Sequence, residues 1–308
     1  MTVGIGDDAA AWQPSRSHLS VVTTDALVDG VHFLSAAMDA RAIGHRAMAA
    51  NLSDIAAMGA RPVLATVVLG VAEATSREWI LDVYRGMSAL AAEYGARIVG
   101  GDIVRSPVAT LSLTVVGEVS RTRLKRRDGG RPNDVLAVTG PLGASRAGLE
   151  LTLRSRTVDE RVRVTALAAF ATPLPRVREG RWLAASTHVH AMMDCSDGLS
   201  TDVGRLARAS GCGAELTDVP VADAAAFVAR AANDVPRAYA LDGGEDFELI
   251  VAIAPRTLRH LARTYQAHFR RPLLVIGRLT AEPGLRVVDA DETRDLVPAG
   301  WDHLRNEV

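Results

Sequence analysis

Short acidic motifs recur along the chain, and each borders an apolar run or sits in a glycine-rich turn. The motifs are Gly6-Asp-Asp8, Thr23-Thr-Asp25, Gly100-Gly-Asp102, Asp194-Cys-Ser-Asp197 and Gly243-Gly-Glu-Asp246. In open α/β sheets, ligands bind at strand ends, so carboxylates gathered there predict a cation site. Clustered hard oxygen donors with few bases nearby favour Mg²⁺, which proteins hold with a few carboxylates and the phosphates of a substrate.

A helix over residues 39–58 is expected to link these motifs. Its apolar residues recur at helical spacing: Ile43, Ala47, Met48, Leu52, Ile55 and Met58. Gly59 can end the helix in the left-handed conformation, and Pro62 prevents its continuation. Asn51 and Asp54 lie three residues apart and share a face near the C-terminal end. A carboxylate there meets the negative end of the helix dipole, so the sequence predicts a compensating positive charge.

The rest of the pattern predicts an α/β protein of two domains. Strands are expected over residues 18–24, 63–69, 97–99, 110–119, 135–138, 190–193, 247–253 and 273–279. Further helices are expected between Ser76 and Gly95, and over residues 143–153, 158–170, 176–185, 198–210 and 255–268. The basic, glycine-containing segment 121–133 interrupts the pattern and reads mostly as a solvated linker. We therefore predict domains over residues 1–133 and 134–308.

Composition excludes several classes of function. The formal net charge of −1 over 308 residues argues against nucleic-acid or membrane-surface binding. We find no signal-peptide pattern and no apolar stretch long enough to span a bilayer. Cys195 and Cys212 form neither a Cys-x-x-Cys pair nor a zinc spacing, which favours a reducing cytoplasmic setting. Lys125 is the only lysine, and there is no phosphate-binding loop of the Gly-x-x-x-x-Gly-Lys type, so phosphate must be bound by metals, arginine and backbone N–H groups.

In this order, the motifs resemble those of thiamine-monophosphate kinases, a family within the aminoimidazole ribonucleotide synthetase-like superfamily. The matching strings are Gly4-Ile-Gly-Asp-Asp-Ala-Ala10, Thr23-Thr-Asp-Ala-Leu-Val-Asp-Gly-Val-His-Phe33, Asn51-Leu-Ser-Asp-Ile-Ala-Ala-Met-Gly-Ala60, Gly100-Gly-Asp102, Asp194-Cys-Ser-Asp-Gly-Leu199, Gly243-Gly-Glu-Asp-Phe-Glu-Leu249 and Gly300-Trp-Asp-His303. The resemblance spans almost the whole chain. Family members usually carry a further segment before the Gly-Asp-Asp motif, which here begins at Gly6.

The resemblance implies the two-domain fold of that superfamily, with mixed sheets, flanking helices and N-terminal domains that pair into a homodimer. It implies several Mg²⁺ ions bound at Asp8, Thr23, Thr24, Asp25, Asp54, Asp102, Asp194 and Asp197. It implies an ATP site at Gly101, Asp102, Arg127 and Ser196, and a thiamine monophosphate site at His32, Glu245 and Trp301.

The implied reaction moves the γ-phosphoryl group of ATP onto thiamine monophosphate. A phosphate monoester has a second pKa of ~6 and is already largely ionised, so no general base is needed. The difficulty is to bring two polyanions together, which metals and positioning solve. Asp54, with Asp25 and Asp194, is expected to be catalytic by holding metals between donor and acceptor.

Each residue has a plainer interpretation. His32 beside Phe33 fits a core histidine, and Trp301 could cap the C-terminal core. Glu245 could be a turn residue and Arg127 a solvated side chain. Cys195 has no histidine nearby in sequence and is interpreted as a small buried residue rather than a nucleophile.

Two alternative functions stay open at this point. One is another ATP-dependent enzyme of the superfamily, of which the aminoimidazole ribonucleotide synthetase type is the main rival. Selenophosphate synthetases need a reactive cysteine or selenocysteine near the N-terminus, and here no cysteine precedes Cys195. The hydrogenase-maturation protein ends in a cysteine, whereas this chain ends in Val308. The other alternative is a non-catalytic nucleotide- or Mg²⁺-binding protein, against which the complete acidic set argues.

Overall fold

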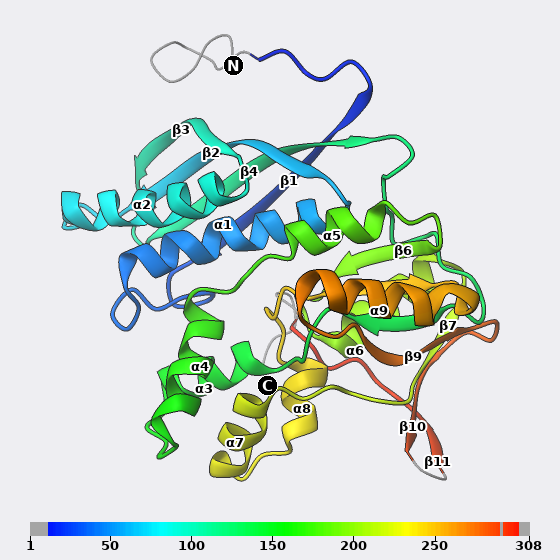
Figure 1. The fold of residues 1–308 in the computed structure, drawn as a ribbon. Helices are drawn as coiled ribbons and strands as arrows, with labels where there is room; N and C mark the ends of the chain where they lie inside the picture. The colour runs from blue at the N-terminus through cyan, green and yellow to red at the C-terminus, as the bar shows by residue number, and fades with distance from the viewer. Residues whose placement is uncertain (1–11, 290–291, 302–308) are drawn as a thin grey trace.

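The computed structural model describes residues 12–289 and 292–301, which form two mixed sheets with flanking helices (Figure 1). The first sheet has the strand order β1-β4-β2-β3 and the second the order β11-β10-β7-β9-β5-β8-β6. The predicted α/β class is therefore confirmed. No helix in the described ranges has the length and apolar character that crossing a membrane requires.

The first sheet and its helices come from the N-terminal part of the chain. The elements are β1 (His18–Val28), α1 (Ala40–Ala57), β2 (Arg61–Val71), α2 (Arg77–Glu93), β3 (Arg97–Arg105) and β4 (Thr110–Ser120). β4 pairs antiparallel with β1 and β2, while β2 pairs parallel with β3. Helices α1 and α2 cover one face of this sheet (Figure 1). On the other face Val22 and Val68 are exposed.

Helix α1 begins and ends where the sequence predicts. Asp39 caps it by accepting hydrogen bonds from the backbone N–H groups of Arg41 and Ala42. Gly59 follows its end with a φ of 68°, the left-handed conformation that glycine adopts freely. Helix α5 (Val177–Ala184) approaches α1 closely: a Cβ atom at Gly180 would lie 2.2 Å from the Ala56 carbonyl oxygen. Helix α1 therefore packs tightly against an element of the second half of the chain.

The second sheet comes from the C-terminal part. Its elements are β5 (Val135–Val138), α3 (Ala144–Leu153), α4 (Glu160–Ala171), α5 (Val177–Ala184), β6 (Val189–Asp194), α6 (Leu199–Ala209), β7 (Gly213–Leu216), α7 (Asp223–Ala232), α8 (Pro236–Asp242), β8 (Leu249–Ile253), η1 (Pro255–Thr257), α9 (Leu258–Phe269), β9 (Leu274–Thr280), β10 (Leu285–Asp289) and β11 (Glu292–Asp295). Helices α3, α4, α7 and α8 gather at one end of the molecule (Figure 1). Since the first sheet uses strands up to Ser120 and the second uses strands from Val135, a boundary near residue 133 stays our prediction.

Several sequence predictions need correction. The strand predicted over residues 97–99 runs on to Arg105 and contains Gly100-Gly-Asp102, and Thr23-Thr-Asp25 lies inside β1 rather than at its end. Five elements were not predicted: β7, α7, α8, β10 and β11. The strands among them have four or five residues, too few to show a period, and α7 is rich in alanine.

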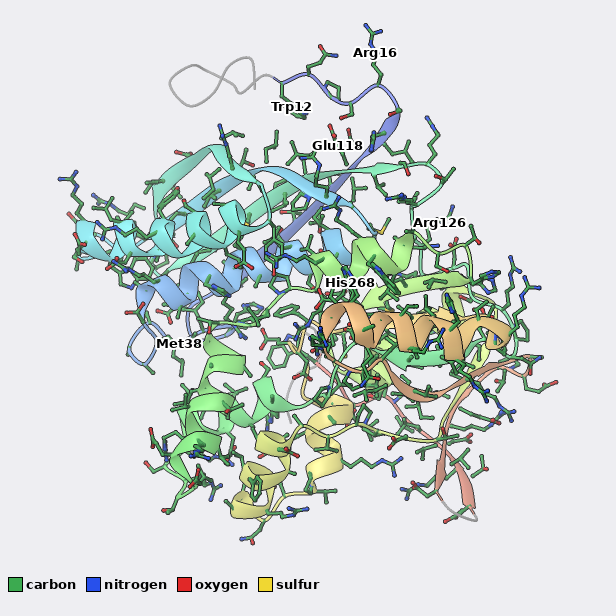
Figure 2. The ribbon with its side chains drawn as sticks, viewed as in Figure 1. Trp12, Arg16, Met38, Glu118, Arg126 and His268 are labelled. Atoms are coloured by element: carbon green, nitrogen blue, oxygen red, sulfur yellow. The ribbon has the colours of Figure 1, made fainter. Side chains whose placement is uncertain are left out.

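The segment between the sheets is also more ordered than a solvated linker. Lys125 is buried, and its Nζ donates hydrogen bonds to the carbonyl oxygens of Ser186 at 2.8 Å and Val189 at 2.7 Å. Next to it, Arg126 accepts a backbone hydrogen bond from Met192 N at 3.1 Å, while its side chain lies at the surface (Figure 2). The segment is therefore fastened to the second sheet.

Candidate active site between the two sheets

Asp54 lies on the last turn of α1 and meets β1. Thr23 donates a side-chain hydrogen bond to the Asp54 carboxylate. Burial raises the pKa of Asp54, while this hydrogen bond and the charge of Arg127 oppose the rise. The sequence predicts a positive charge near Asp54, and Arg127 supplies one.

Asp25 points the same way as Thr23, because residues two apart on a strand share a face. Burial, and then the charges of Asp54 and Asp197, raise the pKa of Asp25 to about 6. The Thr24 side chain points to the other face, where its hydroxyl donates to the Leu113 carbonyl oxygen at 2.8 Å. On the side of Asp25 and Asp54, Thr24 can therefore offer only its backbone atoms to a ligand.

Asp194 brings the second half of the chain into this cluster. It ends β6 and is only 6% exposed. Ser53 of α1 donates a hydrogen bond from Oγ to Asp194 Oδ2 at 2.7 Å. Burial raises the pKa of Asp194 well above its usual range, and the charges of Asp54, Asp202 and Asp25 add to the rise. Carboxylates from β1, α1 and β6 thus lie within electrostatic reach of one another.

The loop after β6 carries Asp197 and is held by a residue that the sequence analysis missed. Asp202 of α6 accepts hydrogen bonds from the backbone N–H groups of Ser196 at 3.0 Å and Asp197 at 2.9 Å. Arg205 of α6 pairs with both Asp197 and Asp202. An acidic residue in the first turn of a helix that follows an acidic motif is the sequence signal that could have indicated Asp202.

The structure does not bring every predicted metal residue together. Asp102 lies on β3 in an exposed stretch, and its charge acts on Tyr84 of α2. Gly101, the residue before Asp102, lies very close to β2: a Cβ atom there would be 1.9 Å from the Val67 carbonyl oxygen. Asp8 lies outside the described residues. Over residues 12–289 and 292–301, no three or more His, Cys, Asp or Glu side chains are arranged so as to hold a metal ion.

The two predicted loops of the substrate site are joined by backbone hydrogen bonds. The N–H of Glu245 donates to the Ser196 carbonyl oxygen at 2.7 Å, and that of Phe247 donates to the Cys195 carbonyl oxygen at 3.0 Å. The N–H of Trp301 donates to the Asp197 carbonyl oxygen at 3.0 Å. Glu245 and Trp301 are therefore fixed beside the loop that carries Ser196 and Asp197.

Trp301 is 45% exposed, so it does not cap a core. The residue before it must be small, because a Cβ atom at Gly300 would lie 1.9 Å from the Asp197 carbonyl oxygen. This close approach brings the tryptophan to the acidic loop. A half-exposed indole beside an acidic loop is the type of side chain on which cationic aromatic rings stack in proteins.

His32 and Glu245 meet through Arg46, another residue that the sequence analysis missed. Arg46 Nε donates to the His32 carbonyl oxygen at 3.2 Å, and its guanidinium pairs with the Glu245 carboxylate. His32 Nδ1 accepts the backbone N–H of Val28 at 3.1 Å, which holds the ring against the end of β1. The half-buried histidine is thus placed by specific hydrogen bonds.

Cys195 is fully buried, as the sequence predicts. Its backbone N–H donates to the Glu248 carbonyl oxygen at 2.8 Å and continues the pairing of β6 with β8. A buried thiol among carboxylates lacks the electropositive, accessible surroundings of a nucleophilic cysteine. The chemistry of this site is therefore that of carboxylates, arginine and backbone donors.

Comparison with known proteins identifies the superfamily to which the chain belongs. Residues 6–119 match the AIR synthase related protein, N-terminal domain, and residues 131–290 match the AIR synthase related protein, C-terminal domain. The chain is an α/β protein of the AIR synthase-related superfamily.

Within that superfamily the chain belongs to the thiamine-monophosphate kinase family, which confirms the resemblance. The thiamine-monophosphate kinase of Synechococcus elongatus is 36% identical over 97% of this chain and 91% of its own length. The crystal structure of thiamine-monophosphate kinase from Stenotrophomonas maltophilia has a TM-score of 0.84 at 35% identity, covering 92% of this chain and 90% of that one. AaThiL complexed with AMPPCP and TMP has a TM-score of 0.83 at 30% identity, covering 95% of this chain and 89% of that one.

Proposed function

We propose that this chain transfers the γ-phosphoryl group of ATP to thiamine monophosphate directly, in a site between its two sheets that holds Mg²⁺. Membership of the thiamine-monophosphate kinase family gives the reaction. The hydrogen bond from Ser53 to Asp194 supports this location of the active site, because it brings α1 and the end of β6 together. Asp54 and Asp194 thereby act as one site.

The residue types suit Mg²⁺, which would also need phosphate oxygens of the substrates, because no three of the described carboxylates are arranged to hold the ion by themselves. Asp25, Asp54, Asp194 and Asp197 supply hard oxygen atoms, and like charges gathered in a partly buried place need a cation. Asp8 and the backbone oxygens of Thr23 and Thr24 complete the proposed set, whereas Asp102 lies apart from it on β3 and is proposed only as an ATP residue. When bound, Mg²⁺ would offset the repulsion between the phosphates of donor and acceptor.

The chain's own residues bind and orient the two substrates. We assign Arg127, Ser196, Gly101 and Asp102 to ATP. The charge of Arg127 acts on the pKa of Asp54, so the two side chains are near each other. This supports placing the Arg127 guanidinium close to the phosphoryl group that is transferred. Arginine suits this role because its planar fork matches phosphate oxygens.

We assign His32, Glu245 and Trp301 to thiamine monophosphate. The Trp301 ring would stack on the cationic thiamine, and Glu245 lies beside the same acidic loop. The acceptor phosphate is already an anion near neutral pH, so none of these residues has to remove a proton. We also propose that the chain acts in the cytoplasm.

We further propose that two copies pair through the open face of the first sheet. Val22 is 69% exposed and Val68 47%, and both lie on the open face of that sheet. Apolar side chains on an uncovered sheet face are typical of an interface.

The proposed function is tested with the full chain, Mg²⁺, γ-labelled ATP and thiamine monophosphate, followed by chromatography. Label in thiamine diphosphate is the expected result, and its absence would leave a non-catalytic nucleotide-binding protein. A second sample without acceptor is denatured and checked for labelled protein. Direct transfer predicts none, whereas protein-bound label that acceptor chases into thiamine diphosphate would show a phosphoenzyme.

A further inference from the structure

Arg46 is a buried cation that the proposed chemistry does not use. It lies in the middle of α1, is 1% exposed, and is among the largest fully buried side chains in the described residues. A buried charge is costly unless it is paired and hydrogen-bonded. Its partners therefore indicate what it does.

The guanidinium joins three segments that are distant in sequence. Nε donates to the His32 carbonyl oxygen at 3.2 Å, in the loop after β1. Nη1 donates to the Phe170 carbonyl oxygen at the end of α4, and the guanidinium carbon lies 4.2 Å from the centre of the Phe170 ring. Nη2 pairs with Glu245. Two of these partners, His32 and Glu245, are proposed thiamine monophosphate residues.

Glu245 needs such a partner because its backbone is in an unfavourable conformation. Its φ is 57° and that of Phe247 is 50°, both in the left-handed region that side chains other than glycine rarely adopt. Surrounding contacts must hold such a segment. The Glu245 side chain is 34% exposed, so it is accessible while Arg46 holds one of its oxygens.

We propose that Arg46 is a positioning residue for thiamine monophosphate: it fixes the Glu245 carboxylate and the His32 backbone in the orientation that receives the substrate. This inference rests on the proposed roles of His32 and Glu245. Because Arg46 is only 1% exposed, it acts through these residues rather than by touching substrate itself. Its loss therefore changes the affinity for thiamine monophosphate and leaves ATP binding almost unchanged, since its contacts are with His32, Phe170 and Glu245.

The test uses Arg46→Lys in the full chain, because lysine keeps the charge but lacks the fork that reaches three partners at once. We expect the KM for thiamine monophosphate to rise about tenfold, which corresponds to losing ~1.4 kcal/mol of charged hydrogen bonding. The KM for ATP should stay within about twofold of the wild-type value. The matched control is Arg41→Lys on the same helix, which is exposed and pairs with Asp82. It should change neither KM.

A double-mutant cycle with Glu245→Gln shows whether Arg46 acts through Glu245. If it does, Arg46→Lys adds little to the KM increase that Glu245→Gln already causes. Additive effects, equal increases in both KM values, or a wild-type KM for thiamine monophosphate in Arg46→Lys would each overturn the inference.

Two further measurements keep the test decisive. Phe170→Leu removes only the ring beneath the guanidinium and should give the same one-sided increase at smaller size, so it replaces Arg46→Lys if that variant does not fold. Calorimetric titration with thiamine monophosphate and an unreactive ATP analogue separates the two proposals. A wild-type chain that does not bind thiamine monophosphate overturns the proposed function together with the inference, whereas wild-type binding that Arg46→Lys leaves unchanged overturns the inference alone.

Discussion

The hydroxyl of Ser53 donates a hydrogen bond to the carboxylate of Asp194 at 2.7 Å, and both side chains are buried. One residue belongs to α1 beneath the first sheet, and the other ends β6 in the second. Because Asp54 follows Ser53 directly, this bond also sets where the Asp54 carboxylate lies relative to Asp194. Burial, and then the charge of Asp54, raise the pKa of Asp194.

Asp54→Asn should abolish thiamine diphosphate formation without unfolding the chain. The change removes one of the carboxylates that would hold metal but keeps the shape of the side chain. We expect kcat to fall by about 10²–10³ or more, the size of losing a preorganised electrostatic contact. The melting temperature should stay the same or rise, since a repulsive charge near Asp25 is gone. Turnover near the wild-type rate at saturating Mg²⁺ would rule out the metal-holding role.

Trp301→Ala should weaken thiamine monophosphate binding far more than ATP binding. An exposed indole stacked on a cationic ring contributes about 1–2 kcal/mol, so a loss of roughly tenfold in affinity is expected. Calorimetric titration with each ligand measures the two affinities. Equal losses for both ligands would instead show that Trp301 supports the fold.

The raised pKa of Asp246 should make the stability of the fold depend on pH, and one substitution measures that contribution. Burial raises the pKa of Asp246 to about 7, although its carboxylate accepts hydrogen bonds from the backbone N–H groups of Gly143 at 2.7 Å and Ser145 at 3.3 Å. The pKa of Asp246 is 3.8 in the unfolded chain and about 7 in the folded chain, so at pH values between these two the carboxyl is protonated only in the folded state. The contribution of Asp246 to stability is therefore full below that window and is lost as the pH rises through about 7.

Asp246→Asn carries a neutral group at every pH and should remove this contribution to the slope. Its melting temperature relative to wild type should rise by at least about 2 °C between pH 5 and pH 8. Thermal melts across that range measure the difference. A constant difference would show that Asp246 stays ionised in the fold.

The chain should sediment as a dimer that depends on the open face of the first sheet. Val22→Asp places a charge among exposed apolar residues there and should give a monomer with unchanged helix content. Analytical ultracentrifugation at micromolar concentration distinguishes the two states. A wild-type monomer would count against pairing through this face.

The sequence predicts elements well where local signals agree and poorly where the partner is distant. Asp39 and Gly59 mark the ends of α1 because capping is a local interaction. Nothing local shows that Lys125 would be buried against Ser186 and Val189, or that Arg46 would reach Glu245. Such buried charges depend on partners more than 60 residues away, which periodicity does not reveal.

The site residues divide in the same way. Asp25, Asp54 and Asp194 stand out in sequence because each belongs to a short motif, and the structure brings them into electrostatic reach. Asp102 stands out equally, yet it lies in an exposed stretch of β3, in register with Val68 on the open face of the sheet. The motif identifies a residue type, whereas the strand register decides where the side chain points.

The most direct measurement is a crystal structure of the chain with Mn²⁺ in place of Mg²⁺, thiamine monophosphate and an unreactive ATP analogue. Anomalous difference peaks locate the metal. We expect peaks within roughly 2.0–2.3 Å of carboxylate oxygens of Asp54 and of Asp25 or Asp194, between the two substrates. Metal bound only to the nucleotide phosphates, with these carboxylates free of it, would contradict a metal site shared by the two sheets.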